Sequence, residues 1–153
     1  MLTACLCGNY EVVRLLLLAK TEPNKPNAQN QSPLTITLLG MMKDPFSFEK
    51  RKIYLMIAAL LVKHGADTNW IFDKKEGFSL LHYFCNLQGE MSFEQKRVNR
   101  DIVCFLLRNG ANPDLLTLDD KKCEQILEDH CIRDELLAIL YEHKAKQPQL
   151  ARS

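Results

Sequence analysis

The residues of this sequence that could do chemistry are its thiols and imidazoles. A cysteine nucleophile needs a histidine beside it as a base and a third group that orients this histidine. No nucleophile motif surrounds any Cys or Ser of the chain. We therefore expect no catalytic residue, although an autonomous enzyme with a cysteine nucleophile stays open as an alternative. The residues concerned are Cys5, Cys7, Cys85, Cys104, Cys123, Cys131, His64, His82, His130 and His143.

Metal sites and cofactor loops are not expected either. The closest pairs of metal-ligating types are Cys5 with Cys7 and His130 with Cys131. Two helical residues two positions apart point about 200° away from each other, so Cys5 and Cys7 cannot bind one ion without unwinding the helix. Glycine-rich phosphate loops are absent from the sequence. We predict no metal and no cofactor.

Composition favours one folded unit in a reducing compartment. The chain has 153 residues, of which 46% are hydrophobic, and its 20 Lys and Arg nearly balance its 19 Asp and Glu. This balance argues against disorder and against a nucleic-acid partner. The longest apolar run, residues 53–62, is too short to cross a membrane. The cysteines follow no secretory signal, so we expect free thiols and a cytoplasmic, intracellular location, with the nucleus not excluded.

Two basic segments, Lys50-Arg51-Lys52 and Lys96-Arg97, could contact phosphates. Acidic residues accompany them and no aromatic platform alternates with them, so solvated charge on an exposed extension is the preferred interpretation. An acidic peptide would suit these segments better than nucleic acid.

The elements that position these residues repeat along the chain. Ser47-Phe48-Glu49 recurs as Ser92-Phe93-Glu94, and His64-Gly65-Ala66 recurs as Asn109-Gly110-Ala111, both at an offset of 45. The apolar positions between them also match, which predicts an amphipathic helix with a glycine stop in each unit. Upstream of each, Ser32-Pro33-Leu34 and Ser79-Leu80-Leu81 have the pattern of a helix start. Each unit therefore contains two helices, and the fold class is all-α.

These patterns resemble the ankyrin repeat, a β-turn and two helices in about 33 residues. Gly8-Asn9-Tyr10-Glu11-Val12-Val13-Arg14-Leu15-Leu16-Leu17 is similar to the family's second helix. The resemblance implies an ankyrin-repeat solenoid with two long-insert repeats and a degenerate C-terminal capping repeat, in which His82 holds a turn together. The expected boundaries are a partial repeat at 1–27, repeats at 28–69 and 70–114, a capping repeat at 115–145 and a disordered tail at 146–153.

The departures from the family pattern carry further predictions. Insertions of about 10 to 12 residues should lengthen the second helices backwards, and the turn of residues 70–77 should protrude. Capping helices are expected near residues 123–130 and 133–144. The chain begins inside a repeat, so we interpret it as a fragment of a longer array. The alternative is that Met1 is a native start and the first helix is merely short. A possible homodimer would then form through an uncovered apolar surface around Leu2, Cys5, Leu6, Val13 and Leu17.

The resemblance implies a non-catalytic module that binds another protein or peptide on a concave face of turn tips and first helices, as part of a scaffold, adaptor or effector. The alternative is a substrate-recruiting domain of an enzyme whose catalytic part lies elsewhere. Trp70 either anchors a partner or folds down over the adjacent turn, as Leu115 and Leu116 would do at the same place in the next unit. The second alternative would leave Phe72 as the more exposed candidate. The expected binding residues are Gln29, Gln31, Thr35, Trp70, Phe72, Lys74, Lys75, Phe78, Tyr83, Asn86, Leu118 and Asp120.

Overall fold

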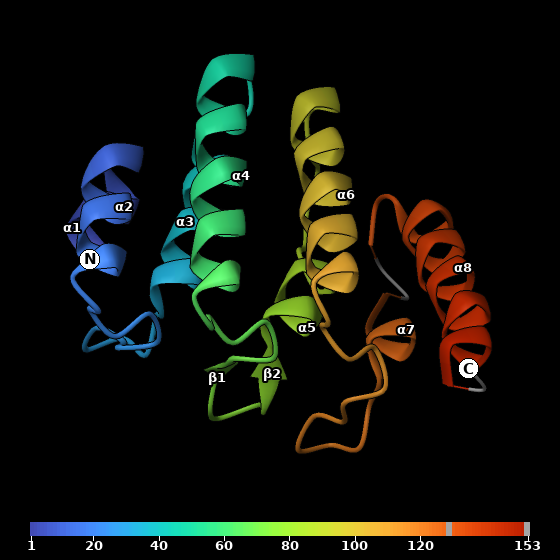
Figure 1. The fold of residues 1–153 in the computed structure, drawn as a ribbon. Coiled ribbons are helices and arrows are strands. Elements are labelled where there is room, and N and C mark those ends of the chain that lie inside the picture. The colour runs from blue at the N-terminus through green and yellow to red at the C-terminus, as the bar shows by residue number, and fades with distance from the viewer. Residues whose placement is uncertain (128–129, 152–153) are drawn as a thin grey trace.

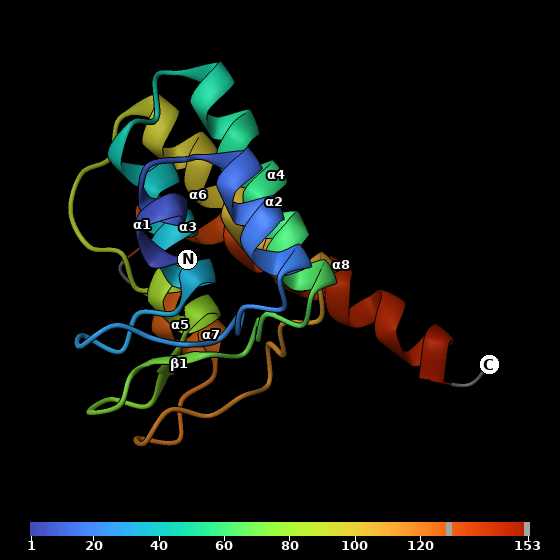
Figure 2. The same cartoon turned by 60° about the vertical axis from the view of Figure 1, so that its left-hand side comes forward.

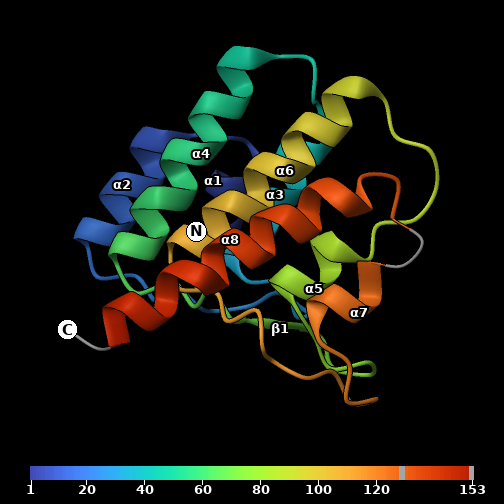
Figure 3. The same ribbon diagram turned by 90° about the vertical axis from the view of Figure 1, so that its right-hand side faces the viewer.

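Helices in two layers form a row from one end of the chain to the other in the computed structural model, which describes residues 1–127 and 130–151, with side chains up to residue 146. α1 packs on α2, α3 on α4 and α5 on α6, whereas α7 packs on α5 and α8 on α6. Figure 3 shows α2, α4, α6 and α8 following one another along the outer layer. The elements are α1 Leu2–Leu6, α2 Tyr10–Leu18, α3 Pro33–Lys43, α4 Phe48–Lys63, β1 Ile71–Asp73, β2 Phe78–Ser79, α5 Leu80–Cys85, α6 Phe93–Arg108, α7 Cys123–Ile126 and α8 Arg133–Ala151.

Serine side chains begin four of these helices. The hydroxyls of Ser32, Ser47, Ser79 and Ser92 accept hydrogen bonds from backbone N–H groups three residues later, at 3.1 to 3.4 Å. Each such cap satisfies a donor that the helix cannot use and contributes about 1 kcal/mol. The helix starts at these serines are therefore local properties of the sequence.

Left-handed residues end the second helices. Gly65 and Gly110 have φ of 96° and 92°, directly after the C-caps of α4 and α6. Lys20 stands 45 positions before Gly65 and takes φ 61°, so a side chain occupies this conformation in the first unit. α4 and α6 have 16 residues each, against nine in α2, in agreement with the predicted lengthening.

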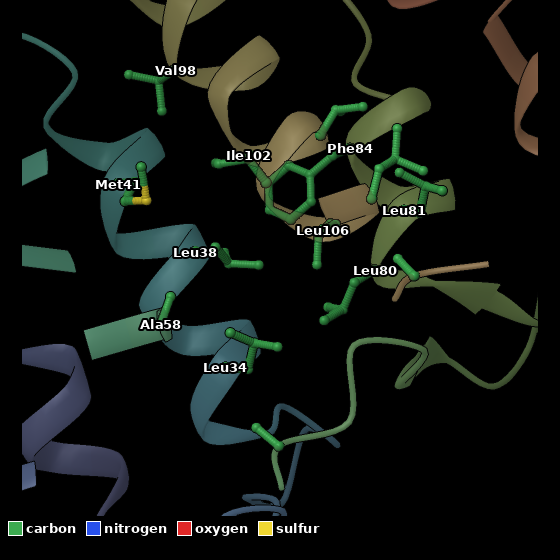
Figure 4. Packing of buried hydrophobic residues seen from close by; sticks show 14 of the residues in the cluster. Leu34, Leu38, Met41, Ala58, Leu80, Leu81, Phe84, Val98, Ile102 and Leu106 are labelled. Atoms are coloured by element: carbon green, nitrogen blue, oxygen red, sulfur yellow. The ribbon is translucent and has the colours of Figure 1, made fainter. Parts of the chain in front are cut away.

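The core is one continuous cluster that runs from Ala4 to Leu140 along the row. Leu34, Leu38 and Met41 of α3 lie toward Phe84, Ile102 and Leu106 of the next unit (Figure 4), and all six are at most 1% exposed. Each helix pair thus buries its apolar face against its neighbour, as in a repeat protein. Among the described residues, no helix has both the length and the hydropathy to cross a membrane.

A small β-hairpin accompanies the helices of this mostly helical chain, which is compatible with the predicted all-α class. β1 and β2 pair antiparallel, with Ile71 opposite Ser79 and Asp73 opposite Phe78. The Asp73 carboxylate accepts hydrogen bonds from the backbone N–H groups of Lys75 and Glu76 at 2.8 and 3.4 Å, which tightens the turn. The enlarged turn therefore folds into a hairpin instead of an open loop, within a chain that is otherwise mostly helical.

Other expectations also need correction. Cys5, Val13 and Leu17 are buried, because α1 packs on α3 and α2 packs on α4. Leu6, Val12, Leu15 and Leu18 are exposed at this end, so Cys5, Val13 and Leu17 do not belong to the predicted apolar surface, whereas Leu6 is exposed as predicted. The tail expected to be disordered from residue 146 is helical to Ala151, because α8 continues, and residues 152 and 153 lie outside the described residues.

Candidate partner-binding face

Three consecutive turns lie side by side at one edge of the molecule (Figures 1 and 2) and are joined by hydrogen bonds. The Trp70 indole Nε1 donates to the Asn30 carbonyl at 2.9 Å, and the Asn30 amide donates back to the carbonyls of Ile71 and Phe72 at 2.8 and 3.2 Å. On the other side of the hairpin, the backbone N–H of Leu118 donates to the Glu76 carbonyl at 3.0 Å. The turn tips therefore form one connected row.

Gly77 lets the hairpin and the following turn approach closely. Its φ is 71°, and a Cβ atom built on it would lie 2.9 Å from both the backbone nitrogen and Cγ of Leu118. No other residue type fits this contact without a shift of the backbone. The sequence thus provides the small residue that the contact between turns needs.

A second ladder joins the turns nearer to the second helices. The Asn24 amide donates to the Gly65 carbonyl at 2.9 Å, and its oxygen accepts from the backbone N–H of Asp67 at 2.8 Å. Asn69, 45 residues later, repeats these bonds with Gly110 and Asn112 at 3.4 and 2.7 Å. Each asparagine side chain thereby ties its own turn to the next one.

The structure exposes some of the predicted binding residues and covers others. Gln29, Lys74, Lys75, Leu118 and Asp120 are exposed, and 69% of Leu118 is accessible. The half-buried residues are Gln31, Trp70, Phe72, Phe78, Tyr83 and Asn86.

Thr35 does not lie on the predicted face, since only 1% of it is exposed. Thr35 is the third residue after the N-cap Ser32, and its hydroxyl is 2.9 Å from the Ser32 hydroxyl. His82 holds the same place after Ser79 and is also buried. The third position after the caps of these two first helices is buried, so Thr35 is a core residue, which corrects its place on the predicted face.

The aromatic residues of the hairpin are partly covered. Trp70 is half-buried and its indole N–H hydrogen-bonds to the Asn30 carbonyl of the preceding turn, which corresponds to the alternative that this side chain packs on an adjacent turn. Phe72 meets the Tyr83 ring edge-on with centroids 4.9 Å apart, so Phe72 is half-buried and not the freely exposed candidate. Phe78 lies 5.8 Å from the His82 ring. These rings form a fixed apolar base under the exposed tips.

Two hollows on this face contain residues that the sequence analysis missed. The larger, about 410 Å³, lies between the first helices and includes Ile36 and Tyr83, while the smaller, about 250 Å³, includes Phe78 and Asn86. Ile36 and Tyr83 are each the fourth residue after a serine N-cap, so counting from the caps could have found Ile36. The other missed residues are Leu6, Leu39, Gly40, Met42, Lys43 and Gln95 in the larger hollow and Glu76, Gln88, Thr117, Asp119, Lys121, Gln125 and Ile126 in the smaller one.

The histidines with described contacts have structural roles. The backbone N–H of Ser79 donates to His82 Nδ1 at 3.1 Å, which places the imidazole proton on Nε2, 2.9 Å from the Leu115 carbonyl. His82 thus connects its own helix start to the next turn. His64 Nδ1 lies 3.0 Å from the carbonyl of Leu60 within its own helix.

Cys123 is the thiol with the most altered environment. A hydrogen bond from Cys85 is the main cause that lowers the pKa of Cys123, and His82 adds to it, against the opposing effect of burial. Cys123 and Cys85 are both 0% exposed. Within the described residues, no three His, Cys, Asp or Glu side chains gather as a metal site requires.

Comparisons with known proteins agree with the repeat pattern. The chain is 27% identical over 126 residues to an ankyrin repeat protein of Acanthamoeba polyphaga mimivirus, and the match covers 82% of this chain and 21% of that protein. No family model matches the chain. The likeness supports ankyrin-like repeats in this chain, which spans about a fifth of the length of the mimivirus protein.

Proposed function

We propose that this chain is a non-catalytic protein-interaction module of the ankyrin type, which binds a protein or peptide on the face formed by its turn tips and first helices. The observation that carries this proposal is the hydrogen-bonded row of turns from Asn30 through the hairpin to Leu118. Loops that are fixed before binding lose little conformational entropy when a partner arrives. The side chains on this row are therefore preorganised for binding.

The exposed side chains of this row define the expected contact. Lys74 and Lys75 project from the hairpin, and Leu118 lies on the next turn with 69% of its surface accessible. A large apolar side chain beside two cations offers both buried area and charge selectivity to a partner. We therefore expect the partner segment to place an apolar residue on Leu118 and an acidic residue near the lysines.

The test is affinity capture from a lysate of the source organism, followed by binding measurements with the purified partner. We expect Leu118→Glu and Lys75→Glu each to weaken binding by roughly tenfold, because each removes a central contact. Both side chains are exposed, so the fold should persist, and Lys63→Glu on α4 is the matched control. Affinities that stay within about twofold of the unmodified chain for both variants would contradict the proposed face.

A further inference from the structure

A groove of about 720 Å³ lies between the two long helices α4 and α6, on the outer layer that faces the viewer in Figure 1. α4 packs on α2 and α3, whereas α6 packs on α3, α5 and α8, so α3 fills the space behind the groove. No described residue of the turn tips or first helices lines it. Its lining residues are Phe48, Arg51, Lys52, Leu55, Met56, Ala59, Arg97, Asp101, Cys104, Phe105, Arg108 and Asn109.

The middle of the groove is apolar because of helical periodicity. Phe48, Leu55 and Ala59 follow at intervals of seven and four on α4, which places them on one face of the helix. Phe105 of α6 lies opposite this stripe, and 43% of Met56 is accessible at the groove. A stripe of this kind is the usual receptor for the apolar face of another helix.

Basic side chains lie at both ends of the apolar stretch. Lys52 and Arg97 stand 45 positions apart, at corresponding places of the two repeats, and Arg108 lies in the last turn of α6. These three are exposed and make no ion pair with another described residue. Glu142 of α8 lies near the Arg108 end, because Lys146 lowers the pKa of the Glu142 carboxyl and Arg108 adds to this effect. Asp101, which also lines the groove, lies between Arg97 and Arg108. The described lining therefore has an excess of positive charge.

Arg51 adds a buried cation at the end of the groove where Lys52 and Arg97 lie. Only 8% of it is exposed, which corrects the expectation of a solvated charge. Its Nη1 lies 3.5 Å from the Glu94 carboxylate but makes no hydrogen bond with a described residue, and its guanidinium is 5.9 Å from the Phe48 ring centre. The long extension thus holds a buried charge whose hydrogen-bonding capacity is not fully used.

The spacing of the charges sets the length of the occupant. Arg97 and Arg108 are eleven residues apart on α6, which corresponds to about 16 Å, or about three helical turns. We propose that this groove binds an acidic amphipathic helix of about three turns from a partner protein. Its apolar face would lie on Leu55, Met56 and Phe105, and its carboxylates would reach Lys52 and Arg97 at one end and Arg108 at the other.

Asp101 makes the proposal selective. A carboxylate in the middle of the bound helix would lie next to the Asp101 carboxylate, and the two negative charges would repel each other. We therefore expect acidic residues at the two ends of the bound helix and neutral residues at its centre. This groove lies away from the turn-tip face, so the two surfaces can be tested separately.

The experiment selects ligands from a displayed library of 16-residue helical peptides on the intact chain. The Lys52→Glu/Arg97→Glu double variant serves for counter-selection. Peptides retained by the unmodified chain alone should carry Asp or Glu near both ends and Leu, Ile or Phe between them. A fluorescein-labelled peptide from this set should lose affinity by roughly tenfold or more with the double variant and bind more weakly at high salt.

Matched variants separate this surface from general charge effects. Lys63→Glu/Lys96→Glu makes the same charge change on the same two helices outside the groove lining and should leave peptide binding unchanged. Asp101→Asn should strengthen binding, and Lys75→Glu on the turn-tip face should not alter it. Circular dichroism of each variant checks that the helices persist.

Three results would overturn the proposal. The first is a set of selected peptides without acidic ends, and the second is equal binding of these peptides to the double variant. The third is binding to phosphatidylserine vesicles that depends on Lys52 and Arg97 while no peptide is retained, since that would assign the basic groove to a membrane surface. Phe46 and Phe93, which are 74% and 70% exposed, would be the residues in contact with such vesicles.

Discussion

Single buried polar residues hold the repeats of this molecule together. His82 accepts from the backbone of Ser79 with one ring nitrogen and approaches the Leu115 carbonyl with the other, so one side chain connects a helix start to the next turn. Thr35 takes the corresponding place in the preceding unit and bonds to Ser32. The third position after the N-cap serine therefore holds either threonine or histidine. Of the two side chains, only that of His82 reaches the next unit.

His130 gives the stability of the protein a dependence on pH. Burial is the main cause that lowers the pKa of His130, against a smaller opposing effect of the Phe84 carbonyl. Its Nδ1 accepts from the backbone N–H of Ile132 at 3.2 Å, an interaction that requires the unprotonated nitrogen. As the pH falls below about 6.5, His130 therefore becomes protonated in the unfolded chain first. In the folded chain it becomes protonated only at a lower pH.

It follows that the stabilising effect of neutral His130 is present above about pH 6.5 and is lost as the pH falls through the range below it. We expect the free energy of unfolding to drop more between pH 7 and pH 5 in the unmodified chain than in His130→Leu. Urea denaturation at both pH values measures this difference. Equal drops in the two proteins, or an NMR titration of His130 above the usual histidine range, would refute the assignment.

At the scale of elements, the ladder formed by Asn24 and Asn69 repeats the same contact between successive turns. Asn24 and Asn69 bond to the turns that follow them with the same pair of atoms, the amide nitrogen to a glycine carbonyl and the oxygen to a backbone N–H. These bonds lie at the exposed edge of the molecule, where water competes for the same groups. The ladder therefore adds a polar connection between neighbouring turns to the apolar packing of the helices.

Asn69→Ala should destabilise the protein by about 1 to 2 kcal/mol, because it removes both bonds and leaves the Asn112 N–H without its acceptor. Thermal and urea denaturation measure this change. Gln29→Ala, at an exposed turn position, is the control and should change stability by less than about 0.5 kcal/mol. An effect of Asn69→Ala as small as that of the control would show that the ladder adds nothing to the repeat interface.

At the scale of the whole molecule, the continuous core decides which thiols can react. Cys5, Cys85 and Cys123 are buried within it, whereas Cys7 and Cys131 are exposed. Burial also raises the pKa of Cys5, which adds to its protection. The lowered pKa of Cys123 would favour reaction, but the side chain has no access to solvent.

Iodoacetamide should therefore modify Cys7 and Cys131 in the folded chain and reach Cys5, Cys85 and Cys123 only when urea unfolds it. Mass spectrometry of digested samples identifies the modified residues, and Cys104, which is half-buried in the groove between α4 and α6, should react at an intermediate rate. Fast modification of Cys123 in the native protein would restore the hypothesis of a catalytic thiol, because a reactive thiolate needs both a low pKa and access.

The sequence by itself determined where the helices after Ser32, Ser47, Ser79 and Ser92 begin and where the two long helices end. Ser32, Ser79, Gly65 and Gly110 act on backbone groups within a few residues, so their effect can be predicted without knowledge of the neighbouring repeat. The offset of 45 residues likewise predicted the long helices α4 and α6 and the correspondence between them.

Only the tertiary structure decided which side chains are exposed and which are buried. The Trp70 side chain hydrogen-bonds to Asn30, forty residues earlier in the chain, and Thr35 is buried in the core. The groove between α4 and α6 exists because both helices pack on other elements, which no local pattern encodes. N-cap serines and helix-ending glycines act through contacts between residues close in the chain, so the sequence alone could predict their effect. The exposure of a side chain depends on contacts between repeats, so it could be known only from the tertiary structure.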